Sequence, residues 1–114
     1  MSSKVLYSEF DKYMTAIDKK FIPAAGDMWR KLSYIVGRPL QHPMAGSTPE
    51  DMFTFTWCNP MSPVTVVVDI YQDGSFEWFY SVRKNHKYGG SDDEKLLEIP
   101  KKLKELLLQF YTRR

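Results

Sequence analysis

Two alternating stretches joined by a glycine turn constrain the fold of this chain more than any other feature of its sequence. In residues 64–70 a valine or isoleucine occupies every second position, and in residues 76–82 aromatic residues occupy positions 76, 78 and 80. Such a period of two is typical of half-buried β-strands. The intervening segment contains Asp73 and Gly74, so we expect the two stretches to form a β-hairpin.

The hydrophobic pattern also predicts the register of this hairpin, because a shift by one residue turns every side chain to the other face of the sheet. A two-residue loop would place Ile70 opposite Glu77 and would mix polar with apolar residues on both faces. A three-residue loop of residues 72–74, with Gly74 in the left-handed conformation, places Ile70 opposite Phe76 and makes one face wholly apolar. We therefore predict the three-residue loop.

A further alternating stretch extends the hairpin to three strands. In residues 53–58 Phe, Phe and Trp alternate with Thr and Cys, so we expect a strand that completes a three-stranded antiparallel β-meander. The preceding residues 38–51 contain three prolines and show no sustained period. This composition predicts a loop.

Apolar residues at intervals of three and four predict two helices before the meander. The first helix reaches about residue 21, because Pro23 disfavours helical geometry at the residue before it and lacks an amide donor. A shorter second helix begins near Asp27 and ends at Gly37, which Pro39 follows.

A third helix follows the meander. Ser91 and the acidic residues after it are typical of a helix N-terminus, and apolar residues then recur at helical spacing as far as Phe110. Pro100 interrupts this stripe, so the helix either kinks or restarts there, and the unbroken phase of the stripe favours the kink. We expect the first and last helices to cover the apolar sheet face and the second to cover part of its rim.

Composition indicates one ordinary α+β domain that spans residues 1–114. Hydrophobic residues make up 43 % and charged residues 26 % of the chain, which suits a chain with its own core rather than a disordered or fibrous one. Cys58 is the only cysteine, which excludes an intramolecular disulfide and a multi-thiolate zinc site. No apolar run is long enough for a membrane span or a signal peptide, so we expect a cytoplasmic protein that does not bind membranes.

No catalytic or cofactor motif stands out. His42 and His86 lack partners at metal-ligand spacing, and the sequence has no glycine-rich phosphate loop. We therefore expect no metal, no cofactor and no enzymatic activity. The predicted register nevertheless places Asp69 opposite Glu77, and facing carboxylates raise the pKa of one of them. An acid–base pair is thus the remaining enzymatic hypothesis, beside the simpler interpretation of a solvated surface pair.

The second face of the predicted sheet is more apolar than a plain solvent-facing surface, and a basic segment, residues 83–88, follows it. Aromatic anchors flanked by charge are typical of protein-binding sites, and a homodimer would be the simplest partner. Nucleic-acid binding through the basic segment is the alternative, with an affinity that falls steeply with salt. The residues expected to bind a partner are Tyr71, Phe79, Arg83, Lys84, His86, Lys87 and Tyr88.

Residues 28–90 combine a tryptophan-containing helix, a proline-rich loop, the sequence STPED at 47–51, a strand ending in Trp57, and the sequence DGSFEWFY at 73–80. In this order these features resemble small uncharacterised bacterial and phage-related α+β proteins. The resemblance rests on structural motifs and brings no catalytic residues with it. It implies a small accessory protein, such as an inhibitor or regulator of a host complex.

Overall fold

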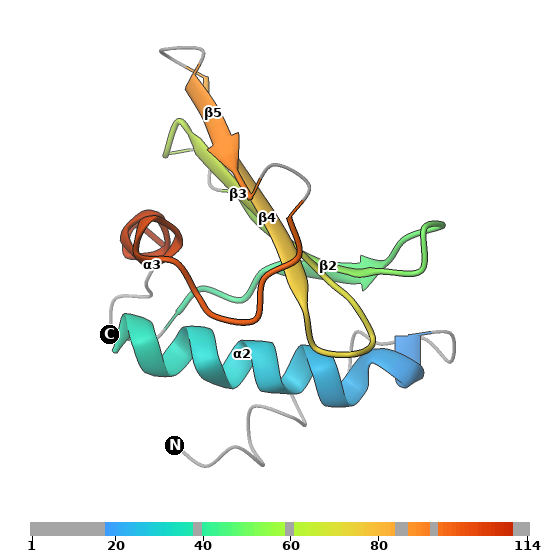
Figure 1. Cartoon of the computed structure of the whole chain (residues 1–114). Coiled ribbons are helices and arrows are strands. Elements are labelled where there is room, and N and C mark those ends of the chain that lie inside the picture. The colour runs from blue at the N-terminus through green and yellow to red at the C-terminus, as the bar shows by residue number, and fades with distance from the viewer. Residues whose placement is uncertain (1–17, 38–39, 59–60, 84–86, 92–93, 111–114) are drawn as a thin grey trace.

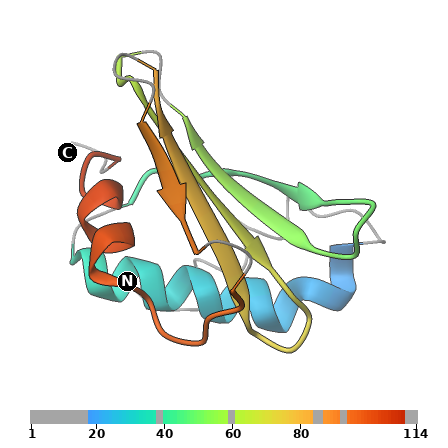
Figure 2. The same ribbon diagram turned by 45° about the horizontal axis from the view of Figure 1, so that its top comes forward.

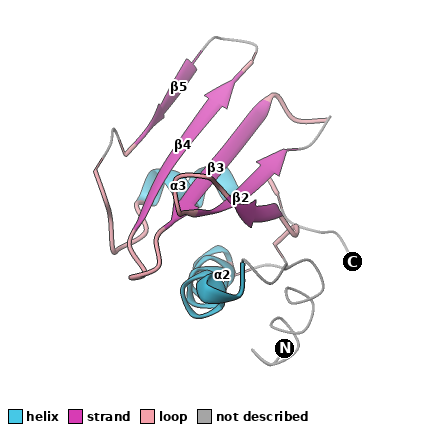
Figure 3. Ribbon diagram, turned by 90° about the vertical axis from the view of Figure 1, so that its right-hand side faces the viewer, coloured by secondary structure: helices cyan, strands magenta, loops and turns pink. Residues whose placement is uncertain are grey.

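The chain folds into one five-stranded antiparallel sheet with both described helices packed on the same face (Figures 1 and 3). The computed structural model describes residues 18–37, 40–58, 61–83, 87–91 and 94–110. Strands are adjacent in the sheet in the order of the sequence. The elements are η1 (Asp18–Phe21), α2 (Ile22–Val36), β1 (Met44–Ser47), β2 (Phe53–Cys58), β3 (Val64–Ile70), β4 (Phe76–Val82), β5 (Lys87–Gly90) and α3 (Lys101–Leu107).

The β3–β4 hairpin has the predicted register. Ile70 lies opposite Phe76, and Val68 lies opposite Trp78. Gly74 adopts a φ of 95°, which a residue with a Cβ rarely does. The amide of Gly74 donates to the Tyr71 carbonyl at 3.0 Å and closes the turn. The prediction that Gly74 sorts the hairpin side chains into an inward and an outward set is confirmed.

The inward set forms the core. We call this side of the sheet the inner face; α2 runs along it and α3 lies beside α2 (Figures 1 and 2). Aromatic rings interlock across the layer, as where Trp29 of α2 meets Phe55 edge-on with centroids 6.5 Å apart. The largest side chains that are less than 2 % exposed are Phe21, Leu32, Phe53, Phe55, Trp57, Val66, Val68, Ile70, Phe76, Leu103, Leu107 and Phe110.

The predicted roles of the N-terminal helices need correction. Helix α2 begins at Ile22 rather than near Asp27, with Pro23 in its first turn, where the missing amide leaves no hydrogen bond unmade. It buries six side chains against the core, so the expectation that it covers only a rim is wrong. The predicted first helix lies largely outside the described residues, which show only the 3₁₀ turn η1 at its end.

Two strands were missed by the prediction of a three-stranded meander. β1 lies within the expected loop 38–51 and pairs with β2. β5 begins in the last two residues of the basic segment 83–88 and pairs with β4. Each has only four residues and neither shows an apolar alternation. Both edge strands are stabilised by backbone hydrogen bonds to a longer neighbouring strand. Such bonds need no particular side-chain pattern, so the sequence of an edge strand does not predict it.

The C-terminal helix begins only after Pro100, so the predicted start near Ser91 and the predicted kink at Pro100 are both wrong. Pro100 has a ψ of 151° and stands outside the helix as its N-cap residue. Before it the chain is extended, and Leu96 exchanges two backbone hydrogen bonds with Phe76 at 2.7 and 2.9 Å. Ser91 likewise bonds to the backbone of Trp78 rather than beginning a helix. Pairing with the free edge of β4 outcompetes helix formation in this segment.

Within the described ranges, no helix has the length and apolar character to cross a membrane.

Candidate protein-binding surface

The second face of the sheet lies opposite the described helices, and we call it the outer face. Its middle is a row of residues that are cross-strand partners from one edge of the sheet to the other: Met44, Thr56, Val67, Phe79 and Gly90. We call this the central row. Met44 is 66 % and Phe79 49 % exposed, although both are large apolar side chains. Such exposure in a continuous row is typical of a contact surface.

A second row of partners lies on one side of the central row and consists of Cys58, Thr65, Ser81 and Tyr88. Tyr88 is 83 % exposed. Because Ser81 is its direct partner and Gly90 is the partner of Phe79, Tyr88 is a diagonal neighbour of Phe79 across β4 and β5. The structure thus places these two exposed rings on one part of the outer face.

Glycines allow β5 to approach β4 closely enough for this arrangement. Gly90 has a φ of 150°, and a Cβ there would lie 2.1 Å from the Trp78 carbonyl oxygen and 2.6 Å from the Phe79 Cα. On the other face, a Cβ at Gly89 would lie 2.9 Å from the Tyr80 ring. Gly90 therefore needs glycine to keep β5 in register, whereas at Gly89 the far end of the Tyr80 ring can move aside. The place of Tyr88 depends on Gly90.

The third row contains Gly46, Thr54, Asp69 and Glu77. The Thr54 hydroxyl donates to Asp69 Oδ1 at 2.8 Å, and the Tyr71 hydroxyl donates to Glu77 Oε1 at 2.9 Å. Burial raises the pKa of Asp69, the Thr54 hydrogen bond lowers it, and the negative charges of Glu77 and Glu50 raise it further. Both carboxylates have hydrogen-bond partners, so a structural pair accounts for the contacts seen.

No larger ligand set surrounds this pair. Among the described residues, no group of three or more His, Cys, Asp or Glu side chains could hold a metal ion. Lys95 lies close to Tyr71, with its Nζ 4.2 Å from the centre of the Tyr71 ring. The third row of the outer face is therefore negatively charged, and Tyr71 lies beside it.

Charge is divided between the two ends of the sheet. The β1–β2 and β3–β4 connections lie at one end, which we call the acidic end. The segments 43–53 and 68–78, which contain them, have five acidic residues and no Lys or Arg: Glu50, Asp51, Asp69, Asp73 and Glu77. Lys20 forms an ion pair with Asp51 there.

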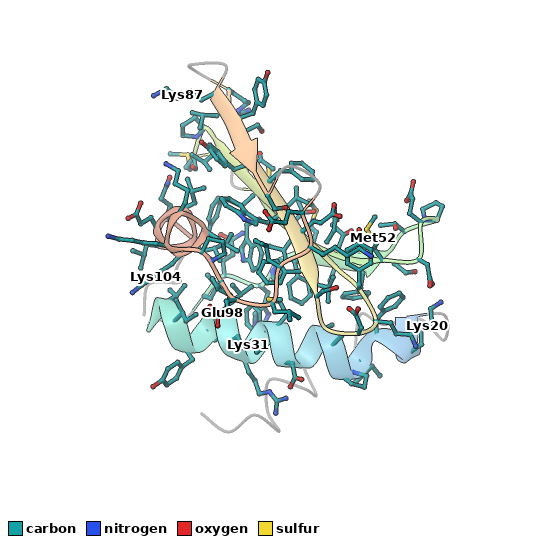
Figure 4. The ribbon with its side chains drawn as sticks, in the orientation of Figure 1. Lys20, Lys31, Met52, Lys87, Glu98 and Lys104 are labelled. Carbon is teal, nitrogen blue, oxygen red and sulfur yellow. The ribbon has the colours of Figure 1, made fainter. Side chains whose placement is uncertain are left out.

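The opposite end, which we call the basic end, contains the β2–β3 and β4–β5 connections. The segments 57–67 and 79–91 around them have no acidic residue and carry Arg83, Lys84 and Lys87. Figure 4 shows Lys87 near the free end of the β4–β5 hairpin, far from Lys20 and Met52 at the other end. Acidic residues of the strands and their connections thus gather at one end of the sheet and basic residues at the other, while Lys20 and Lys95 lie beside the acidic residues.

The structure brings together only part of the predicted partner-binding set. Phe79 and Tyr88 share the outer face, and Arg83 lies at the basic end with its guanidinium 3.1 Å from the Ser62 carbonyl oxygen. Lys87 is the partner of Val82, so its position belongs to the inner face. Tyr71 lies at the acidic end, half-buried, and Lys84 and His86 lie outside the described residues. Met44 was not predicted, because its place on this face depends on β1.

Comparison with known proteins finds no protein family, no curated sequence and no solved structure that matches the chain. The resemblance to phage-related proteins therefore stays a hypothesis.

Proposed function

We propose that this chain is a small non-catalytic binding protein that recognises another protein through its outer face, with Phe79 and Tyr88 as anchors. The observation that carries this proposal is the exposure of the two aromatic rings on adjacent strands, opposite the face that the described helices cover. Aromatic side chains supply most of the binding energy in many protein interfaces, because they bury a large area at little entropic cost. A rigid sheet also holds both rings in place before binding, which lowers the cost of association.

Regulation or inhibition of a larger complex is the version of this function that the phage-related resemblance favours. We place the protein in the cytoplasm, since Cys58 is free and exposed and a reducing compartment would keep it so. In this proposal the chain provides a binding surface and catalyses no reaction.

Nucleic-acid binding has less support from the outer face. Asp69 and Glu77 lie on the same face as Phe79, with Glu50 near enough to raise the Asp69 pKa. A phosphate backbone that crossed this face would meet these carboxylates, whereas sites for single-stranded nucleic acid surround their stacking aromatics with positive charge. Only the basic end, with Arg83 and Lys87, favours phosphate.

The chain offers a matched pair of tyrosines to test the proposal. Tyr88 on the outer face is 83 % exposed, and Tyr34 on helix α2 is 88 % exposed. Wild type, Tyr88→Asp and Tyr34→Asp are immobilised as full chains, and the proteins they retain from lysate are quantified by mass spectrometry. We expect Tyr88→Asp to lose a near-stoichiometric protein that wild type and Tyr34→Asp both retain.

Retained copies of the chain itself count as such a protein. The proposal fails if all three baits retain the same proteins, or if wild type retains none. Binding of single-stranded RNA that falls steeply with salt and is lost in Tyr88→Asp, without a protein partner, would establish the nucleic-acid alternative instead.

A further inference from the structure

We infer that the partner of the outer face is a second copy of this chain, joined edge to edge by antiparallel pairing of the two β5 strands into one continuous sheet. This inference rests on the proposed function of the outer face and names its partner. Three features of β5 carry it: the direction of its backbone groups, the glycine that the register places opposite Tyr88, and the charges on either side of the strand.

The backbone of β5 is open on one side. β5 is the outermost strand of the sheet, and no described segment pairs with its far side (Figure 3). The Ser91 amide donates to the Trp78 carbonyl at 2.9 Å, so these residues form a hydrogen-bonded pair of the antiparallel ladder. Because such pairs alternate with non-hydrogen-bonded ones, the N–H and C=O groups of Tyr88 and Gly90 point away from β4. β5 therefore presents the backbone groups of two residues to an incoming strand.

One antiparallel register lets two copies use all of these groups. With Gly89 on a twofold axis perpendicular to the sheet, Tyr88 of each copy lies opposite Gly90 of the other. Each of these pairs exchanges two backbone hydrogen bonds. An axis at Tyr88 or at Gly90 would leave only one such pair between the two strands. The register centred on Gly89 thus satisfies the most backbone groups, and it leaves both outer faces on the same side of one sheet.

Gly90 leaves room for the aromatic rings in this register. The central row of one copy, which runs from Val67 through Phe79 to Gly90, continues across the axis into the partner's Tyr88. The Tyr88 ring is 83 % exposed in the single chain, and it can lie over the partner's Gly90 because that residue has no side chain. Phe79 is the next residue of the row, two strand spacings or ~10 Å away, which two aromatic side chains can span. The dimer would thus bury the two rings that the single chain exposes.

Charge favours the antiparallel arrangement. The chain changes sign across β5, because residues 83–87 carry three positive charges and no acid, whereas residues 91–94 carry three acids and no Lys or Arg. Antiparallel strands place the basic start of each β5 beside the acidic segment that follows the other. Parallel strands would place like charges together, and such contacts are costly. One copy therefore carries both halves of a complementary edge.

Lys87 and Glu94 are the described charges that this register brings together, and both residues are exposed. Lys87 lies opposite the partner's Ser91. The Glu94 amide donates to the Ser91 carbonyl at 3.0 Å, so a turn keeps Glu94 near Ser91. Lys95, the next residue, lies over the Tyr71 ring instead. The twofold axis repeats the contact, so the dimer has two pairs of Lys87 with Glu94.

The small contact makes this a reversible dimer. β5 has only four residues, so the two strands and their rings bury less than the ~800 Å² per partner of a standard interface. The charge pairs are exposed, so salt screens them. We therefore expect dissociation in the range of roughly ten micromolar to several hundred micromolar at low salt, and weaker association at high salt.

The wild-type chain tests the strand pairing without any substitution. Sedimentation equilibrium and amide hydrogen exchange of the full chain would be measured from about one micromolar to about one millimolar, a range that spans the expected dissociation constant. We expect the amides of Tyr88 and Gly90 to gain protection as the dimer forms. The amide of Ala45 is the control, because the alternation of pairs in β1 directs it toward the opposite edge of the sheet. Its exchange should not depend on concentration.

The charge variants Lys87→Glu and Glu94→Lys test the orientation. Each places like charges at both contacts of its own dimer, so each should raise the dissociation constant roughly five-fold or more at low salt. An equimolar mixture of the two should associate within about three-fold of wild type, because both contacts of the mixed dimer are again of opposite charge. The control Lys104→Glu, at an exposed position of α3, makes the same charge change as Lys87→Glu and should alter the constant less than about two-fold. Circular dichroism checks that each variant is folded.

A wild-type chain that stays monomeric throughout would overturn the inference. So would a dimer in which the Tyr88 and Gly90 amides gain no protection, or a mixture of the charge variants that shows no recovery. The proposed function is tested separately by the tyrosine baits. Loss of a different protein from the Tyr88→Asp bait, together with a monomeric chain, would refute self-association alone. No tyrosine-dependent capture and no dimer would refute both.

Discussion

Replacement of Gly90 by alanine should separate strand β5 from the rest of the fold. A Cβ at this position would meet the Trp78 carbonyl oxygen at 2.1 Å, the Phe79 Cα at 2.6 Å and the Phe79 Cβ at 2.9 Å. Two of these three atoms are backbone, so no side-chain rotation relieves the overlap. The φ of 150° adds strain that an L-residue does not accept easily.

The expected loss follows from these two effects. A sparsely populated φ costs ~1–3 kcal/mol at a non-glycine residue, and overpacking against a rigid neighbour costs ~1–3 kcal/mol. Together they give a loss of about 2–6 kcal/mol if β5 stays in place. Since β5 has only four residues, the chain can avoid the larger losses by releasing it from β4. In either case the amide protons of β5 should exchange with solvent faster than in the wild type.

Gly46 on β1 is the matched control, because it is also a glycine of a four-residue edge strand and a Cβ there meets no atom within 4 Å. Urea unfolding and amide hydrogen exchange would be measured for both alanine variants. We expect Gly46→Ala to stay within ~0.5 kcal/mol of wild type or to gain slightly in stability. If Gly90→Ala matched wild type within ~0.5 kcal/mol and kept the protection of β5, the account of the close approach of β4 and β5 would be wrong.

Three further predictions follow from the same structure. Gly74→Ala should cost ~1–2 kcal/mol in urea unfolding, less than Gly90→Ala, because its φ of 95° is strained for alanine but no atom lies within 4 Å of the added Cβ. Burial raises the pKa of Asp69, so the folded chain binds more protons than the unfolded chain between the ordinary aspartate pKa and the raised one. Stability should therefore fall as pH rises through that window, and Asp69→Asn, which can still accept from Thr54, should flatten this part of the profile in urea titrations at several pH values. Leu103→Ala should cost ~2–5 kcal/mol because Leu103 is fully buried, whereas the exposed Leu97→Ala should change the melting curve little.

The sequence predicted the β3–β4 hairpin down to its register, because alternation and a turn glycine are both local signals that only one pairing satisfies. The same sequence rules gave wrong helix boundaries at Pro23 and at Pro100. Pro23 fits the first turn of a helix as well as the position after its end, and only the core contacts of α2 decide between the two. At Pro100 the apolar stripe continues in phase, yet Leu96 uses its backbone to pair with Phe76 instead.

The sequence did not predict how the exposed residues of the outer face lie next to one another. Phe79 and Tyr88 were expected to bind a partner, but their adjacency depends on the pairing of β5 with β4. Gly90 permits this pairing, and no hydrophobic periodicity in the sequence predicts it. Met44 joins the surface only through β1, a strand whose Met-Ala-Gly-Ser sequence resembles a loop. Edge strands are stabilised by a neighbour that the local sequence does not contain, so the local sequence gives little sign of them.

The composition of the outer face itself argues for reversible rather than permanent association. Obligate interfaces resemble a protein core, whereas the central row alternates large apolar residues with Thr56 and Gly90 and is bordered by a carboxylate row. A monomer can expose such a face without aggregating, because its apolar groups form a narrow row rather than a broad patch. The polarity between the two ends then limits which surfaces it can pair with. In the proposed function Phe79 and Tyr88 supply the binding energy and the charged ends supply the selectivity, so substitutions at the rings and at the ends should affect affinity and orientation independently.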